Sequence, residues 1–324
     1  MIVKLFLLLT ILNSILAQDN IKITEVIDNH KKEFYIIKNN DQKIKIKELS
    51  SSNKKEVYKF NDFHEGLAQF YFDTIYSDEG GFIDTNGDVV FFFNDGPYSD
   101  FQEGLAVKFQ TTYWNKKVNF IDKTGKKVLT DYYGAREYSH GLAPVSKVGK
   151  LKLKALDDVP IYTNLKWGYI NKNNKFIIKP QYDDAKPFSK EGVAFVKKHG
   201  RWKEIMDKGE KVFDLLVEGK WGIINSKGNL IKNYIYNDVG DFSDGLAPVL
   251  IGGKEKIRLE YIGPNGHPYA EIYFKNGKWG YINSKAELKI KPIFEEAGNF
   301  ENGYAFVKLK GKEFKIDKSG SVVQ

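Results

Sequence analysis

Three Trp-Gly pairs stand out as residues that could bind a ligand, because they recur at equivalent places along the chain. The pairs are Trp167-Gly168, Trp221-Gly222 and Trp279-Gly280. Indole rings at equivalent positions of successive structural units would form a ladder on which a glycan could stack. The alternative is that each indole packs between adjacent hairpins and that the glycine lets a neighbouring backbone approach closely. We favour the packing role, and the glycan ladder stays an alternative.

Other residue types with chemical potential do not form a catalytic or metal-binding pattern. The five histidines show no metal-ligand spacing, and there is no G-x-S-x-G elbow, H-E-x-x-H motif or phosphate-binding loop. The acid pairs Asp183-Asp184 and Glu295-Glu296 recur at equivalent places, which favours a structural position over one asymmetric active site. A glycosidase pair of carboxylates stays open. We predict no catalytic residue, no metal and no cofactor, and we take Trp114, in an expected loop, as a candidate surface-binding residue.

Tandem repeats carry these residues. A first landmark is an aromatic residue followed three or four positions later by glycine, an aliphatic residue and alanine. Its glycines are Gly66, Gly104, Gly141, Gly192, Gly245 and Gly303. They lie 38, 37, 51, 53 and 58 residues apart, so the basic period is near 38 and the later units carry insertions. We expect these glycines, like those of the Trp-Gly pairs, to have structural roles.

A second landmark is a tight turn between two strands, with Asp or Asn at its first position and Gly or Asn at its fourth. The first residue can accept backbone hydrogen bonds and the fourth can adopt a positive φ, which is typical of a type I turn closed by a left-handed residue. The six copies begin at Asp84, Asp122, Asn171, Asn225, Asn283 and Asp317. In one copy the fourth residue is Ala286, where we expect a strained positive φ.

The landmarks predict an all-β fold made of a tandem array of β-hairpin repeats. We favour an open, solenoid-like array, and a β-propeller is the alternative. Because Trp202 lies 19 residues before the next Trp-Gly pair, we expect an extra hairpin at 198–213. Pro180 should end strand pairing, since proline cannot donate to the ladder. The segments 147–165 and 250–276 are insertions.

The segments KWGYIN and KPQYD, together with the repeated aromatic-x-x-Gly-Leu-Ala motif, resemble the WG-repeat (WG containing β repeat) family of bacterial proteins. The resemblance covers roughly Phe34 to the C-terminus. In three copies Gly80, Val118 and Glu313 replace the tryptophan. The resemblance implies an all-β repeat protein, often exported, and supplies no catalytic residue. Residues 18–324 are thus expected to form one WG-type β-repeat domain of about seven units plus the extra hairpin.

The first 17 residues predict a signal peptide, with Lys4, the apolar run Leu5–Leu16 and the small residue Ala17. The run is too short to span a bilayer as a stable helix. The chain has no cysteine, so it can form no disulfide. Its net charge of +8 comes from lysines spread along expected strand faces, which argues against a nucleic-acid partner. We expect an exported protein (periplasmic, cell-surface or secreted) without a transmembrane segment in the mature chain.

Repetition without a unique catalytic constellation predicts a non-enzymatic repeat protein that mediates binding or interaction at the cell envelope. The partner would be a protein or a cell-surface glycan. The alternative is a secreted carbohydrate-binding module or carbohydrate-active enzyme, and a purely structural envelope component is a third. We expect binding at the concave face of the array or at the inserted segments.

Overall fold

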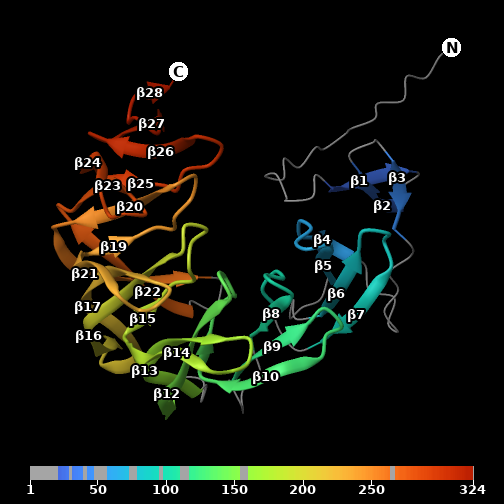
Figure 1. Cartoon of the computed structure of the whole chain (residues 1–324), viewed down its shortest axis with the longest axis horizontal. Helices are drawn as coiled ribbons and strands as arrows, with labels where there is room; N and C mark the ends of the chain where they lie inside the picture. The colour runs from blue at the N-terminus through green and yellow to red at the C-terminus, as the bar shows by residue number, and fades with distance from the viewer. Residues whose placement is uncertain are drawn as a thin grey trace. The chain divides into compact units, whose positions relative to one another are not determined.

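The structure is a computed structural model that describes residues 21–28, 31–38, 42–46, 57–72, 79–94, 98–109, 117–153, 160–262 and 267–323 (Figure 1). The predicted signal peptide, residues 1–17, and the candidate binding residue Trp114 lie outside these ranges. The described residues form strands and turns and contain no α-helix, so the all-β prediction is confirmed. Accordingly, no helix in this part of the chain is long and apolar enough to cross a membrane.

The chain divides into two compact units built from small antiparallel sheets, which we number in chain order. The first unit comprises Met1–Thr112 with Val118–Thr130, and the second comprises Tyr113–Lys117 with Asp131–Gln324. The first contains sheet I, with β1 (Lys22–Asp28), β2 (Lys31–Ile37) and β3 (Lys43–Lys45), and sheet II, with β4 (Val57–Phe60), β5 (Leu67–Phe72), β6 (Gly80–Asp84) and β7 (Val89–Phe93). Sheet III consists of β8 (Leu105–Lys108), β9 (Val118–Asp122) and β10 (Lys127–Tyr132).

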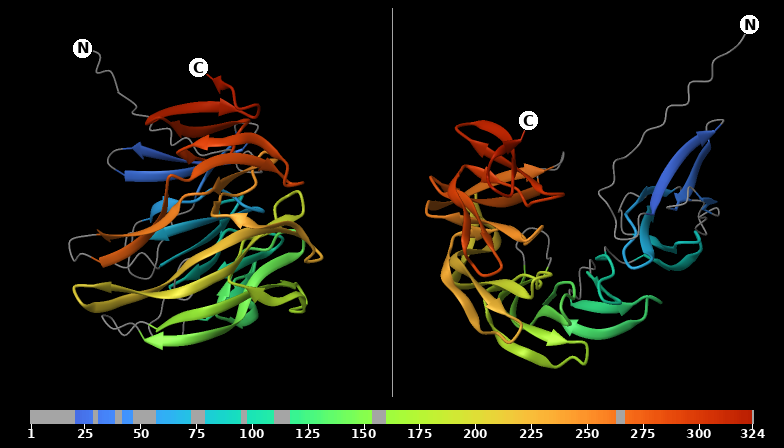
Figure 2. Two further views of the ribbon diagram at one scale, coloured as in Figure 1. Left: turned by 90° about the vertical axis from the view of Figure 1, so that its left-hand side faces the viewer. Right: turned by 45° about the horizontal axis from the view of Figure 1, so that its top comes forward.

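The second unit contains four sheets of four strands, each following the chain back and forth (Figure 2). Sheet IV has β11 (Gly134–Ala135), β12 (Leu142–Leu153), β13 (Pro160–Asn171) and β14 (Phe176–Tyr182). Sheet V has β15 (Asp184–Ala185), β16 (Val193–Asp207), β17 (Glu210–Asn225) and β18 (Leu230–Tyr236). Sheet VI has β19 (Asp238–Val239), β20 (Leu246–Ile251), β23 (Lys278–Asn283) and β24 (Leu288–Phe294).

Sheet VII completes the second unit with β25 (Glu296–Ala297), β26 (Tyr304–Leu309), β27 (Lys312–Asp317) and β28 (Val322–Val323). Strands β21 (Lys254–Ile262) and β22 (His267–Lys275) pair with each other as a separate hairpin inserted into sheet VI. None of the described sheets closes into a barrel, and the prediction of a tandem array of β-hairpin repeats is confirmed.

The glycine landmark forms the turn that leads into the second strand of each repeat. At the first copy, His64 and Leu67 exchange two backbone hydrogen bonds, of 2.8 and 3.1 Å, across Glu65 and Gly66. Both turn residues have positive φ, 51° and 83°, which defines a type I′ turn. Positive φ at both positions explains why the second one is glycine.

The second landmark is a turn closed by its own first side chain. In each copy the Oδ1 atom of the leading Asp or Asn accepts the backbone N–H groups two and four residues later, at 2.8–3.1 Å. The fourth residue has positive φ in every copy. Ala286 has φ 61°, so the predicted left-handed alanine is confirmed.

The glycine of each Trp-Gly pair faces a bulge in the fourth strand of its own sheet. A Cβ atom on Gly168 would lie 2.4 Å from the carbonyl oxygen of Ile178 and 2.7 Å from the nitrogen of Pro180. Pairing resumes beyond the bulge, where Tyr182 lies opposite Trp167. The prediction that Pro180 ends pairing was therefore wrong: Pro180 lies within β14, at a bulge where no ladder hydrogen bond is required of it.

Each hydrophobic core of the second unit lies between two consecutive sheets, so both faces of an inner sheet are buried. In sheet V, Phe195 and Trp221 pack toward sheet VI, while Ala194 and Val196 pack toward sheet IV. Consecutive sheets also make contact through the Asp/Asn turns, because the turn that begins at Asn225 in sheet V lies on β14, the fourth strand of sheet IV. A Cβ on Gly228 would lie 3.2 Å from Ile178.

Candidate binding site

The repeated tryptophans lie in the cores between sheets. Trp167 and Trp221 are 8% and 6% exposed, and Trp279 is half-buried against the core between sheets VI and VII. The guanidinium of Arg136 lies over the Trp167 ring, 4.8 Å from its centroid. An indole that is more than nine-tenths buried offers little face to a sugar. This placement supports the packing role of the Trp-Gly pairs.

The recurring acid pairs are engaged in contacts that join neighbouring sheets. Asp183 is buried, forms an ion pair with Lys166 and accepts the Gly200 N–H at 2.8 Å. Asp184 forms a 2.8 Å ion pair with Arg136.

The second pair is also engaged, but only Glu295 contacts both sheets, whereas the ion pair of Glu296 lies within sheet VII. Glu295 accepts the Gly311 N–H at 3.0 Å, and Glu296 forms an ion pair with Lys308 at 2.8 Å. All four carboxylates make an ion pair or accept a hydrogen bond within the framework. Within the described residues, no group of three or more His, Asp or Glu side chains could hold a metal ion.

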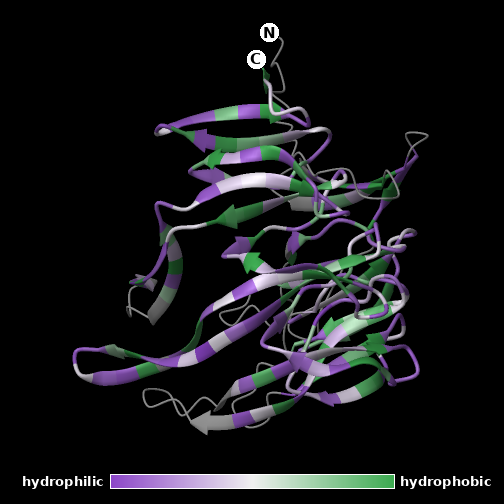
Figure 3. Ribbon diagram, turned by 60° about the vertical axis from the view of Figure 1, so that its left-hand side comes forward, coloured by the Kyte–Doolittle hydropathy of each residue, from purple (hydrophilic) through white to green (hydrophobic). Residues whose placement is uncertain are grey.

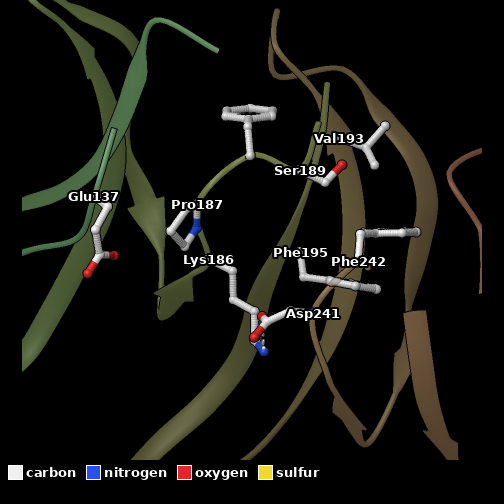
Figure 4. A pocket seen from close by; sticks show the side chains of 9 residues that line it. Glu137, Lys186, Pro187, Ser189, Val193, Phe195, Asp241 and Phe242 are labelled. Atoms are coloured by element: carbon white, nitrogen blue, oxygen red, sulfur yellow. Dashed lines mark hydrogen bonds and ion pairs between the residues drawn. The ribbon is translucent and has the colours of Figure 1, made fainter. Parts of the chain in front are cut away.

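One pocket of the second unit does combine apolar walls with polar groups (Figure 4). Its volume is about 270 Å³. The residues that line it are Glu137, Lys186, Pro187, Phe188, Ser189, Val193, Phe195, Asp241 and Phe242. They come from the connectors that enter sheets IV, V and VI and from strand β16. This size is close to the lower end of the range for small-molecule sites, and it fits one sugar ring or one long side chain.

The pocket wall is apolar on the side of sheet V. The Phe195 and Phe242 rings are stacked, with centroids 5.0 Å apart and an interplanar angle of 11°. Phe188 and Val193 are buried beside them, and Figure 4 shows the two stacked rings side by side. Such a wall would hold the apolar face of a ligand by excluding water from it.

The polar groups at the pocket are acceptors that are only partly used. The ammonium of Lys186 donates to the Val239 carbonyl at 3.1 Å and to Asp241 Oδ1 at 2.8 Å, so its charge is neutralised. Within the described part of the chain, no residue pairs with the carboxylate of half-buried Glu137. The pocket thus favours a ligand that brings hydrogen-bond donors or a positive charge.

The pocket lies where sheet V differs from sheet VI at one strand position, which Phe306 also occupies in sheet VII, and where the adjoining turn is longer than in the other copies. In sheet VI, Pro248 packs against Gly240, where an added Cβ would lie 2.4 Å from the proline Cγ. The equivalent residues in sheet V are Lys186 and Phe195, and Phe195 turns its ring onto Phe242 instead. The turn beside it is also one residue longer than in the other copies, since Ser189 bonds to Val193 across three residues.

Three sheets of the second unit carry elongated hairpins between their second and third strands (Figure 3). In sheet V the hairpin is continuous from Val193 to Asn225 and folds back at 208–209. The prediction of a separate extra hairpin at 198–213 is therefore corrected. These residues form the distal part of β16–β17, because Lys198 pairs with Lys220, Gly200 pairs with Glu218, and the ladder continues past the register shift between Ile205 and Met206.

The elongated hairpins of sheets V and VI lie side by side. The Glu255 carboxylate accepts the Glu218 N–H at 2.9 Å near their bases, and the Tyr261 hydroxyl is hydrogen-bonded to Asp207 near their far ends. The insertions recognised in the sequence at 147–165 and 250–276 both fall in such hairpins.

Sequence reasoning did not find the pocket, because those of its lining residues that belong to a motif, Phe188, Val193 and Phe242, belong to the repeated glycine landmark, which was assigned a structural role. The one signal was the inserted residue in the turn ending at Gly192. That insertion marks the repeat in which the connector differs from its copies. Whether a pocket forms depends on which side chain packs beside Lys186, and contacts between repeats decide this.

Comparisons with known proteins give one family match. A family model for the WG containing repeat matches residues 120–150, 167–202, 221–254 and 279–312. No curated protein matches the sequence. Among solved structures, the chain is similar to one titled "Crystal structure of the tricorn protease", with a TM-score of 0.43 and 11% identity. The similarity covers 94% of this chain, and this chain spans 32% of that one.

Proposed function

Since the chain belongs to the family of proteins built from WG containing repeats, we propose that it is an exported, non-enzymatic protein that mediates binding at the cell envelope. The repeated residues stabilise the array: the tryptophans pack in or against the cores, and Asp183, Asp184 and Glu295 make contacts between successive sheets. The pocket at Glu137 and Phe242 departs from the repeat, and it is where a ligand would bind. The ligand is a protein or a cell-surface glycan.

The observation that carries this proposal is the Glu137 carboxylate, which has no partner among the described residues and borders a wall of buried rings. A half-buried acid without a partner loses hydration and gains no hydrogen bond in return. A ligand with a donor group above an apolar body would supply the missing bond. A lysine or arginine side chain of a protein and the hydroxyl groups of a sugar both have this form.

Binding is tested with the wild-type chain, Glu137→Gln and the control Glu301→Gln, which changes an exposed acid away from the pocket. Each is screened on a glycan array and on a panel of purified envelope proteins, with product release followed at the same time. We expect a ligand whose binding weakens at least tenfold in Glu137→Gln and is unchanged in Glu301→Gln. Equal binding by all three chains would exclude the pocket. Release of a sugar product would instead favour the carbohydrate-active enzyme.

Export is tested separately by fractionating cells that produce the full-length chain. The signal-peptide prediction expects a mature chain that starts after Ala17, detected by mass spectrometry in the exported fraction. An intact chain that stays in the cytoplasm would overturn the export part of the proposal and leave the binding part unaffected.

A further inference from the structure

The hairpin β21–β22 has two unlike faces. One face carries Ile257, Leu259 and Ile272, all partly buried, on the side of hairpin β16–β17. Glu255 lies on the same face and accepts the Glu218 N–H, so this is the face that hairpin β16–β17 covers. Because side chains alternate along a strand, the residues between them point the other way.

The opposite face is basic at its base. Lys254 lies directly opposite Lys275 in the ladder, and Lys256 lies two pairs further, opposite Tyr273 on the same face. Like charges directly opposite each other destabilise a pair of strands. Within the described residues, none of these three lysines has a carboxylate partner, although exposed acids are common elsewhere in the chain.

The charge is segregated along this face. Nearer the tip, Arg258 lies between two acids, with ion pairs to Glu260 at 2.8 Å and to Glu271 at 2.5 Å. Tyr273, 42% exposed, lies opposite Lys256 and between Glu271 and Lys275 on its own strand, and the Arg258 guanidinium lies 5.8 Å from its ring centroid. The face thus joins free positive charge to one exposed aromatic ring.

The neighbouring turn at the base of the hairpin carries charges of both signs. Lys278, which follows β22, lies 4.0 Å from Glu295, and Glu295 accepts the Gly311 N–H. Gly311 is flanked by Lys310 and Lys312, both exposed. Glu296 and Glu313 lie close to Lys308 beside the same turn, so lysines and acids are mixed there.

From this arrangement we propose that the outer face of β21–β22 binds an acidic polysaccharide. A chain of sugars with carboxylate or sulfate groups would place its charges on Lys254, Lys256 and Lys275. One sugar ring would pack on the exposed ring of Tyr273. This surface is a separate site from the pocket described above, and the two are tested independently. Release of counterions from three neutralised charges would give a slope of log K against log salt of about −2, by analogy with single-stranded polyanions.

The test uses a triple variant with Lys254→Gln, Lys256→Gln and Lys275→Gln. Its control is Lys175→Gln, Lys179→Gln and Lys227→Gln, three exposed lysines in other parts of the second unit. Both variants lose the same net charge, so a difference between them reports the position of the charges. The probes are polygalacturonate, a heparin oligosaccharide, neutral dextran and single-stranded DNA.

We expect the wild-type chain and the control to bind polygalacturonate or heparin, and the β21–β22 variant to bind at least tenfold more weakly. Polygalacturonate separates carboxylate from the sulfate chemistry of heparin. Equal weakening in both variants would show that only net charge matters and would overturn the proposal. Binding of dextran as strong as that of the acidic glycans would overturn it as well. So would DNA binding that depends equally on the same three lysines.

A second variant removes the whole surface without changing the sheet below it. Deletion of 253–276 joins Gly252 to Gly277, which leaves a two-residue turn between the paired residues Ile251 and Lys278. Sheet VII closes at the equivalent place with the two-residue turn Lys310-Gly311, in which both φ values are positive. The deletion should abolish binding of the acidic polysaccharide while unfolding remains cooperative. Retained binding would place the site elsewhere.

Discussion

Replacement of Gly168 by alanine tests the explanation of the Trp-Gly pair most directly. The new Cβ would lie 2.4 Å from the Ile178 oxygen, 2.7 Å from the Pro180 nitrogen and 2.8 Å from the Lys179 carbonyl carbon. All three are backbone atoms of β14, so no side-chain rotation can relieve the contact. Either the bulge or the strand must move.

The magnitude follows from two opposing terms. Overpacking of this kind costs about 1–3 kcal/mol. Restricting the unfolded chain by replacing glycine with alanine stabilises by about 0.4–1 kcal/mol. We therefore expect Gly168→Ala to lower the free energy of unfolding by about 1–2 kcal/mol, or Tm by about 2–8 °C for a unit of this size.

The assay is urea unfolding followed by circular dichroism, with Gly298→Ala as the control. A Cβ on Gly298 would lie 3.4 Å from the Phe306 oxygen, which is ordinary contact, so this variant should stay within about 0.5 kcal/mol of wild type. Gly222→Ala should fall between the two, since its closest backbone atom would be 2.8 Å away. An unchanged urea midpoint for Gly168→Ala, or an equal loss in Gly298→Ala, would refute the reasoning.

Three further changes test other parts of the framework. Ala286→Gly removes the strain of a left-handed alanine, which is worth about 1 kcal/mol. It also removes a methyl group that packs against the core between sheets V and VI, which is worth about 0.8 kcal/mol. Urea unfolding should therefore show a free energy of unfolding that is higher by a few tenths of a kcal/mol, and a loss above about 1 kcal/mol would contradict the explanation. Asn225→Ala removes two side-chain–backbone hydrogen bonds and should cost about 1–2 kcal/mol, whereas Asn225→Asp should be nearly neutral in the same assay. Burial raises the pKa of Asp238, so the folded state binds its proton more tightly than the unfolded state does. Asp238→Asn should therefore have a higher Tm than wild type at pH 7. The difference should shrink as the pH falls through the folded pKa and vanish below about pH 4, and a constant difference would count against it.

The local structure of the repeats could be predicted from the sequence because short-range rules determine it. The Asp or Asn at each turn and the left-handed residue three positions later were recognised in all six copies, including Ala286. Each of these turns is specified by residues within a span of five. The choice between an open array and a β-propeller cannot be made from short-range rules, because it depends on small rotations between successive sheets. The open array stays a prediction, and a near-circular outline in solution scattering would favour the propeller.

Features that depend on packing between repeats escaped the sequence analysis. Pro180 seemed to forbid pairing, and only the bulge opposite Gly168 shows how β14 continues through it. Trp202 suggested a unit of its own, because the ladder from Lys198 to Lys220 cannot be seen in the sequence. The pocket arises where Phe195 takes a place that proline holds in sheet VI. No local rule distinguishes that substitution from a neutral one.

The placement of every core between consecutive sheets has a consequence for how the second unit unfolds. Sheet V shares one core with sheet IV and another with sheet VI, so its loss would expose both at once. Sheet VII has one such core among the described residues. Nearest-neighbour coupling of this kind lets a sheet with one such core open without its distant neighbours. Amide hydrogen exchange should accordingly be slowest in β16 and β17 beside their cores and become progressively faster toward β27.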